Sequence, residues 1–193
     1  SFDKVPLDDN GYNHWLDSWD YALRHIQQNP TIRVFGTGPE TYAHAQDAAE
    51  IDGLTLEFGV RFGTSIRQIA SRTDGAVHGF DSFQGLPEAW QNNPVGEYTT
   101  HGELPEVPDN VELHVGWFED TIPPFKAEND GPIRFMNIDC DIYSSTNTIL
   151  DLLHDRIVPG TVIAFDEYFC NPSWRFDEFK AFQEAVEQYG WSY

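Results

Sequence analysis

The fold is decided by the stretch LTLEFGVRFGTS, residues 54–65. It begins as a short apolar run with a β-branched residue, ends in small residues, and is followed by a helical pattern over 66–70. This order predicts a strand, a glycine turn and a helix, which together present backbone N–H groups and a helix N-terminus to the polar end of a ligand. Gly59 and Gly63 would let the chain approach a ligand that a Cβ would push away.

Glu57 is the unusual residue of this stretch, because a carboxylate at the inner end of a buried parallel strand needs a partner. A cationic ligand group, such as an amine or a sulfonium, would supply one. The pattern E-x-G-x-x-x-G differs from the dinucleotide fingerprint G-x-G-x-x-G. It is similar to the first motif of class I methyltransferases that use S-adenosylmethionine (SAM). Glycine-rich strand–helix turns are common in α/β domains, so at this point a purely structural turn stays open.

The length and the net charge of the chain limit the number of domains and the kinds of partner that it can have. The 193 residues (22.0 kDa) suit a single domain, residues 1–193, with a proper core. Eleven basic against 32 acidic residues give a net charge of −21, which repels nucleic acid and anionic membranes, so neither is expected as a partner. There is no signal-peptide pattern and no apolar run long enough for a bilayer. Cys140 and Cys170 fit a reducing cytoplasm, although a bridge between them stays open.

The first 52 residues are expected to form a helical cap over one side of a ligand cleft, with plain packing helices as the alternative. One amphipathic helix is predicted over 14–27 and a second from the capping box Thr37–Glu40 to about Ile51. The first carries an apolar stripe of Leu16, Trp19, Leu23 and Ile26.

Residues 53–193 alternate between strand and helix patterns, which predicts an α/β core with a mostly parallel sheet and helices on both faces. Turn signals at Pro123-Pro124 and over 129–132 are expected on either side of a short helix. The irregular segment 84–110, rich in Gly and Pro, is predicted to be a substrate lid, with disorder as the alternative. Strands are predicted over 54–58, 76–80, 111–115, 133–138 and 161–165, and further helices over 145–157 and 174–189, the last with Phe176, Phe179, Phe182 and Val186 facing inward.

Acidic residues follow the predicted strands. Open parallel sheets bind ligands beyond the carboxyl ends of their strands, and this rule places five acids on one rim. Such acids repel one another unless cations are bound. Oxygen-only ligands suit Mg²⁺, and Asp139, Asp166 and Glu167 are the predicted metal ligands. Helix capping is the alternative for Asp139 and Asp141. The five acids are Glu57, Asp81, Asp139, Asp166 and Glu167.

Other candidate positions concern a nucleoside. Asp81 ends the second strand and is predicted to hold both ribose hydroxyls, or else to cap the turn 82–85. Trp117 and Phe118 are candidates to enclose an adenine, with core packing as the alternative. The seven histidines are scattered without metal spacing, and His101 and His114 are expected to be loop and strand residues rather than ligands.

Five stretches together resemble a known family over about residues 37–189. They are EFGVRFGTS (57–65), GFDSFQGLP (79–87), GWFEDT (116–121), NIDCDIYSS (137–145) and FDEY (165–168). In this order they closely resemble the macrocin O-methyltransferase family of bacterial SAM-dependent enzymes, which act on sugars of macrolide and aminocoumarin antibiotics. The resemblance implies a Rossmann-like class I methyltransferase fold and Mg²⁺-assisted methylation of a hydroxyl on a small molecule, a sugar or natural product.

The resemblance also implies residue roles. Glu57, Gly59, Gly63, Thr64 and Ser65 would hold the methionine part of SAM. Asp81 would hold the ribose, with Ser82 and Phe83 beside it, and Trp117 and Phe118 would flank the adenine. Gly116 and Asp139 are also expected to contact the cofactor. Asp139 and Asp166 match metal ligands, whereas Glu167 stands where the antibiotic enzymes usually carry Asp, so its direct coordination is left open. Family members also end in a β-hairpin that this sequence lacks or begins only at Trp191.

The sequence thus predicts an O-methyltransferase in which Asp139 is both metal ligand and nearest base. One rival is an NAD-dependent or nucleotide-sugar enzyme, which the missing G-x-G-x-x-G disfavours. A second is a SAM-binding domain without catalysis, or with a regulatory role, inside a larger protein. The acceptor and the oligomeric state, a homo-oligomer included, are left open.

Overall fold

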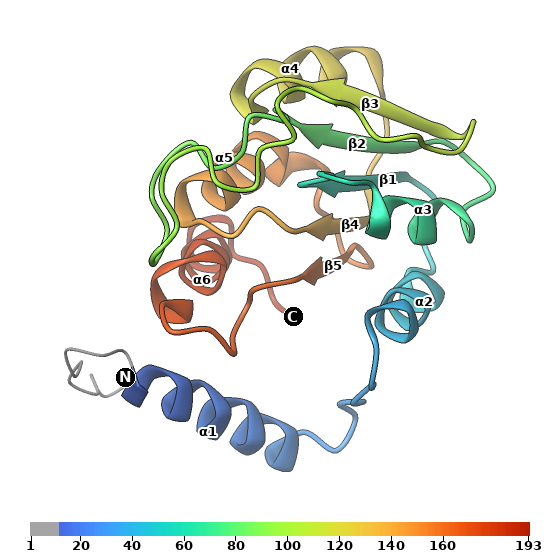
Figure 1. The fold of residues 1–193 in the computed structure, drawn as a ribbon. Coiled ribbons are helices and arrows are strands. Elements are labelled where there is room, and N and C mark those ends of the chain that lie inside the picture. The colour runs from blue at the N-terminus through green and yellow to red at the C-terminus, as the bar shows by residue number, and fades with distance from the viewer. Residues whose placement is uncertain (1–11) are drawn as a thin grey trace.

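A single parallel sheet forms the centre of the protein in a computed structural model. The backbone is described for residues 12–193, and side chains are described from residue 17 onward. The strand order is β3-β2-β1-β4-β5 (Figure 1). All four pairings are parallel, as the alternating pattern predicts. The strands are β1 (Leu54–Phe58), β2 (Val77–Asp81), β3 (Val111–Val115), β4 (Ile133–Ile138) and β5 (Val162–Phe165).

Helices cover both faces of this sheet (Figure 1). Helices α4, α5 and α6 share one core with the strands, whereas α2 and α3 lie over the other face. The helices are α1 (Tyr12–Gln28), α2 (Gly38–Ala48), α3 (Thr64–Ala70), α4 (Phe118–Glu128), α5 (Tyr143–Leu153) and α6 (Glu178–Tyr189), with 3₁₀ turns at His154–Arg156 and Trp174–Phe176.

Aromatic rings dominate the core beneath α4. Phe58 and Phe80, on neighbouring strands, stack with centroids 4.9 Å apart, and Phe125 of α4 meets Phe80 edge-on at 5.1 Å. All three are buried. Burial of one such side chain contributes about 1.5–3 kcal/mol, so this cluster fixes α4 on the sheet.

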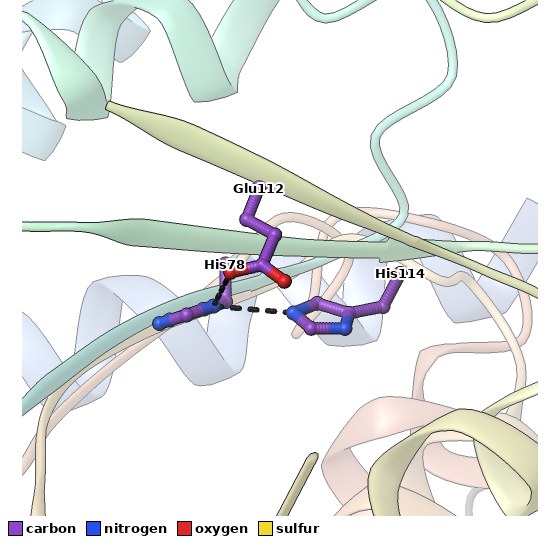
Figure 2. A group of neighbouring side chains, drawn as sticks. All are labelled: His78, Glu112 and His114. Atoms are coloured by element: carbon purple, nitrogen blue, oxygen red, sulfur yellow. Dashed lines mark hydrogen bonds and ion pairs between the residues drawn. The ribbon is translucent and has the colours of Figure 1, made fainter. Parts of the chain in front are cut away.

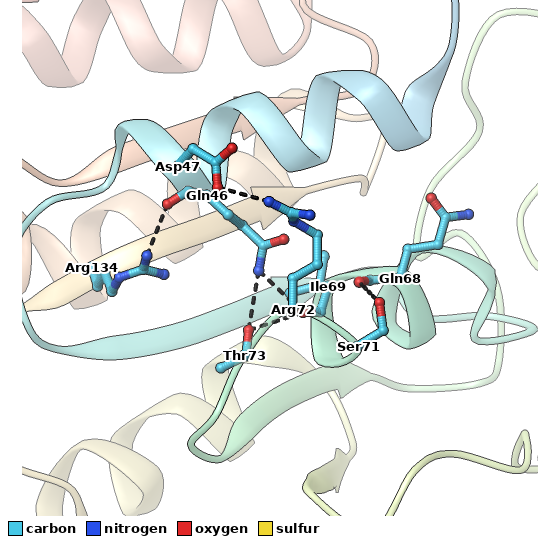
Figure 3. A network of polar contacts seen from close by, with 8 residues as sticks. All are labelled: Gln46, Asp47, Gln68, Ile69, Ser71, Arg72, Thr73 and Arg134. Atoms are coloured by element: carbon cyan, nitrogen blue, oxygen red, sulfur yellow. Dashed lines mark hydrogen bonds and ion pairs between the residues drawn. The ribbon is translucent and has the colours of Figure 1, made fainter.

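On the second face of the sheet, polar side chains also hold α2 in place (Figure 3). The buried side chain of Gln46 on α2 donates from Nε2 to the carbonyl oxygen of Ile69 and to Thr73 Oγ1, both at 3.1 Å. Arg134 of β4 donates to the carbonyl oxygen of Gln46 at 2.8 Å. These bonds tie α2 both to α3 and to the sheet.

The capping box predicted at the beginning of α2 also forms, because the Glu40 N–H donates to Thr37 Oγ1 at 3.4 Å.

Helix α4 corrects one prediction. Pro123 and Pro124 lie inside it rather than in a turn. Proline lacks the N–H that an interior helix position donates, so two helical bonds are lost. The flanking Ile122 and Phe125 are buried in the core, and their burial offsets that loss.

Helix α1 forms where predicted, but its apolar stripe does not lie in the core. The buried positions are Ser18 and Ala22, whereas Trp19 and Leu23 are about half exposed. The side chain of Leu16 lies outside the described residues. Contacts of α1 run to the segment before α6, where Arg175 forms a two-bond ion pair with Asp17 at 2.6 and 2.9 Å.

The last third of the chain differs in detail from prediction. The helix predicted over 174–189 is divided into the 3₁₀ turn and α6, and Phe176 is exposed rather than inward-facing. Phe179 and Phe182 are buried as predicted. Within residues 12–193 no strand follows α6. Both cysteines are free, so the bridge left open by the sequence does not form.

Residues 84–110 contain no helix or strand apart from one isolated bridge between Trp90 and Asn93, as expected. No helix in the described part of the chain is both long enough and apolar enough to cross a bilayer.

Candidate active site

The carboxyl ends of the strands carry the predicted acids to one edge of the sheet. Backbone bonds extend the strand pairing just past the strand ends: the Asp139 N–H donates to Phe58 O at 2.8 Å and the Asp166 N–H donates to Ile138 O at 3.0 Å. The residues that follow β4 and β5 are therefore held side by side, next to the turn that follows β1.

A cavity of about 390 Å³ opens at this edge. Its wall combines the turn after β1, the ends of β2 and β3, and the segments after β4 and β5. Most of the residues predicted from the sequence line it: Gly59, Thr64, Ser65, Asp81, Ser82, Gly116, Trp117, Phe118, Asp139, Asp166 and Glu167. Glu57, Gly63 and Phe83 are not part of its wall.

Glu57 lies beside the cavity, fully buried in β1. Its Oε1 accepts a hydrogen bond from Asn137 Nδ2 at 3.0 Å, whereas Oε2 has no hydrogen-bond partner among the described residues. Burial raises the pKa of Glu57 to about 7, although the nearby side chains of Ser65 and Asn137 oppose the shift. A buried carboxylate of this kind is stabilised by a cation that reaches its free oxygen.

The acids after β4 and β5 repel one another. Burial, followed by the charges of Asp166 and Asp141, raises the pKa of Asp139 to about 8. Burial and the charge of Glu167 raise the pKa of Asp141 to about 7. Burial also raises the pKa values of Asp166 and Glu167. Oxygen donors from two adjacent strands thus converge on one cavity, and this donor set fits a hard divalent cation.

Asp81 already has partners on the protein. Its Oδ2 accepts from the N–H groups of Val60 and Arg61 at 2.9 and 2.7 Å, and its Oδ1 accepts from the Phe83 N–H at 2.7 Å. The last bond is the turn cap left open as an alternative. Because Asp81 also lines the cavity, the capping bond and a contact with a ribose are compatible.

Gly59 serves a contact that the sequence did not predict. Its φ is +92°, and a Cβ there would lie 1.8 Å from the carbonyl oxygen of Asp139. The close approach therefore joins the turn after β1 to the segment carrying Asp139. Gly63, with φ +73°, begins α3 as its N-cap.

Of the aromatic residues predicted for the cofactor site, two line the cavity and one is buried in the core. Trp117 is 37% exposed, and Phe118 meets the buried Phe58 edge-on at 5.6 Å. Both line the cavity, so Phe118 packs in the core and faces the cavity at once. Phe83 is buried in the core beneath α3.

Two charged residues of the cavity wall, Asp141 and Arg61, are not among the site residues predicted from the sequence. For Asp141 the sequence predicts a helix cap or no role, and for Arg61 it predicts none. Arg61 lies over the ring of Tyr98 at 4.9 Å and lowers the pKa of Asp141 against the larger effect of burial. The D-x-D spacing of Asp139 and Asp141 was the available signal for the first of them.

The segment 84–110 borders the same cavity through Leu86, Pro87 and Tyr98. It is tied to the beginning of α6 and to α5, because Trp90 Nε1 donates to Asp177 Oδ2 at 2.9 Å and Ser144 Oγ donates to Glu88 Oε1 at 2.6 Å.

Comparison with known proteins agrees with this arrangement. A family described as a methyltransferase domain matches residues 56–168. Mycinamicin III 3''-O-methyltransferase of Micromonospora griseorubida is 27% identical over 176 residues, which are 76% of this chain and 65% of the relative. The 8-demethyl-8-(2,3-dimethoxy-alpha-L-rhamnosyl)-tetracenomycin-C 4'-O-methyltransferase of Streptomyces olivaceus is 29% identical over 143 residues, 61% of this chain and 54% of the relative. The chain thus spans between 54% and 65% of the length of these relatives.

Solved structures confirm the Rossmann-like class I methyltransferase fold. The calicheamicin methyltransferase CalS11 matches 95% of this chain and 88% of its own, at 21% identity and a TM-score of 0.68. The O-methyltransferase NovP matches 78% of this chain and 72% of its own, at 23% identity and a TM-score of 0.53. Together with the two relatives, these likenesses support the resemblance to macrocin O-methyltransferases found in the sequence.

Proposed function

Because the chain belongs to the methyltransferase domain family, we propose that it transfers the methyl group of SAM to a hydroxyl of a small molecule, a sugar or another natural product. One observation carries this proposal: a single cavity is bordered both by the glycine turn after β1 and by the acids after β4 and β5. A cationic cofactor and a hydroxylated acceptor therefore have chemically suitable walls in the same space. The two O-methyltransferase relatives support the reaction type.

The cofactor half of the cavity is assigned to the turn after β1 and the ends of β2 and β3. SAM supplies a methyl group on a sulfonium, together with a charged amino acid end. Thr64 and Ser65 belong to this part of the wall, and the buried Glu57 behind it is the proposed partner of that positive end through its free carboxylate oxygen. Asp81 and Trp117 border the part of the wall assigned to the ribose and adenine.

The acceptor half is assigned to the acids. We propose Asp139, Asp166 and Glu167 as ligands of Mg²⁺, since all three line the cavity and offer only oxygen donors. Such an ion, when bound, lowers the pKa of a hydroxyl and orients it. Asp139 is also proposed as the nearest base, and Asp141 on the same wall is the second candidate for accepting the proton. Alignment of two reactants in one site can contribute roughly 7–11 kcal/mol to catalysis.

The remaining proposals concern the segments that border or cover the cavity, and the cellular compartment. We propose segment 84–110 as the substrate lid, because its residues Leu86, Pro87 and Tyr98 border the cavity. Of the predicted helical cap over residues 1–52, residues 1–11 lie outside the described residues. For residues 12–52 the cap remains a proposal, and α2 supports it by packing beside α3 and the sheet. The free cysteines support a cytoplasmic setting, and the charge of −21 argues against a nucleic-acid substrate.

The test is methyl transfer by the Asp139→Asn variant. The wild-type protein, supplied with SAM, Mg²⁺ and a panel of hydroxylated sugars and phenols, should release S-adenosylhomocysteine. Asp139→Asn should bind SAM by calorimetry but lose turnover, and Asp141→Asn shows which acid takes the proton. Asp130→Asn is the matched control, because that side chain is fully exposed in a distant turn. Unchanged methylation by Asp139→Asn would contradict its assigned role.

A second candidate is a SAM-binding domain without catalysis inside a longer polypeptide. The sequence leaves this candidate open, and the chain spans 54–65% of the length of the two relatives. Tight SAM binding without turnover on the whole acceptor panel would support this candidate over the first.

A further inference from the structure

Three potential metal ligands lie together on the outer half of the sheet, away from the acids described above. His78 of β2 lies in register with Glu112 of β3, and His114 follows two residues later on β3 (Figure 2). Side chains two residues apart in a strand point to the same face, so all three share the face covered by α4. Tertiary structure alone brings them together, because 36 residues separate the two histidines.

The ligand atoms are close enough to share one ion. His78 Nδ1 lies 3.1 Å from His114 Nε2 and 3.6 Å from Glu112 Oε2, and all three ligand atoms lie within 4.8 Å of one another. A tetrahedral zinc ion with bonds of about 2.0–2.1 Å holds its ligand atoms about 3.3 Å apart. The separations of 3.1 and 3.6 Å from His78 Nδ1 lie on either side of that value. The side chain of Glu112 is 66% exposed, so it can rotate to bring its carboxylate oxygen closer to His114 Nε2.

Aromatic neighbours hold the two imidazoles in place. Phe125 of α4 contacts both rings, at 4.8 Å from His78 and 5.1 Å from His114. Phe80 stacks on His114 at 4.5 Å. The imidazoles are thus fixed by packing before any ion arrives, whereas the carboxylate is the mobile ligand at the solvent side.

We propose that His78, Glu112 and His114 form a site for a borderline divalent ion, with zinc as the first choice. Two imidazole nitrogens and one carboxylate oxygen are ligands that zinc, cobalt and nickel accept, whereas Mg²⁺ prefers oxygen alone. The ion takes the place of the hydrogen bond between the two rings. Water occupies the fourth position on the exposed side of Glu112. The net charge of −21 raises the local concentration of cations around the protein.

The site is separate from the proposed Mg²⁺ ligands in place and in chemistry. His78 lies three residues before Asp81, about 10 Å along an extended strand, and none of the three ligands lines the cavity. The ion joins β3 to β2, and β3 is an edge strand with no neighbour on its other side in residues 12–193. Its expected effect is therefore to stabilise this edge, independently of methyl transfer.

Zinc titration of the chelator-treated protein tests the proposal, with a chromophoric chelator as competitor. One equivalent should bind, and the melting temperature should rise. Cobalt in place of zinc should give the intense visible absorption of a four-coordinate site. His114→Gln and Glu112→Gln should each weaken zinc binding at least tenfold. These two are preferred to variants of His78, which is buried and risks misfolding when changed.

Two control variants separate this site from other sources of binding. His44→Gln removes an exposed imidazole from α2 and should bind zinc as the wild type does. Asp139→Asn should also retain the tight equivalent, because the acids at the strand ends are not part of it. Unchanged zinc affinity in both His114→Gln and Glu112→Gln would overturn the proposal, as would loss of the equivalent in Asp139→Asn. Neither result depends on whether the protein transfers methyl groups.

Discussion

Replacing Glu57 by Gln should weaken cofactor binding and should make the folded protein more stable relative to the wild type as the pH rises. In the folded protein the pKa of Glu57 is raised from 4.5 to about 7, chiefly by burial. Between these values the folded state holds a proton that the unfolded state has released. The stability contribution of this group is therefore fully present below about pH 4.5 and is lost as the pH rises through about 7.

The size of the effect follows from the shift. At 1.36 kcal/mol per pKa unit, a rise from 4.5 to about 7 corresponds to ~3 kcal/mol over the whole range. Between about pH 5.5 and pH 8 roughly 2 kcal/mol of this is lost in the wild type. Glutamine has no charge to bury, so Glu57→Gln escapes this loss. Its stability relative to the wild type should rise by ~2 kcal/mol over that interval. Any constant cost of the buried amide cancels in the difference.

Urea unfolding at the two pH values measures this directly, with Glu50→Gln as the control, because Glu50 is an exposed carboxyl just after α2. The same change should weaken SAM binding at least tenfold at about pH 8, where the wild-type carboxylate is charged. Wild-type affinity for SAM should rise as the pH increases through about 7, because the cation binds the ionised form. A relative stability of Glu57→Gln that does not change with pH would refute the reasoning, since the carboxyl would then be solvated in the folded protein.

Two further substitutions test how the cavity wall is assembled. Gly59→Ala should lose SAM binding and several kcal/mol of stability, because its Cβ would collide with the carbonyl of Asp139. Gly131→Ala, with a similarly positive φ but nothing within 4 Å, is the control for backbone strain, and an equal loss in both would argue against the contact. Trp90→Phe removes the hydrogen bond to Asp177 that anchors segment 84–110, with an expected cost of about 1–3 kcal/mol in thermal unfolding and an increased KM for the acceptor. An unchanged KM would mean that this anchor does not shape the acceptor site.

Much of the architecture was determined by the sequence alone. Apolar runs with β-branched residues gave the five strands, because a strand buried on both faces admits few polar residues. The strand positions then required the acids after β4 and β5 to meet at one edge, because parallel strands point the same way. The position of Asp139, Asp166 and Glu167 on one cavity therefore follows from the order of strands and acids in the sequence.

Tertiary structure decided the rest, because it depends on contacts between residues far apart in the chain. The exposed stripe of α1 and the prolines inside α4 depend on what the neighbouring elements bury. The contact of Gly59 with Asp139 needs the register of β1 against β4. The meeting of His78 with His114 needs the register of β2 against β3, which no spacing within the sequence encodes, because backbone pairing and packing set it together.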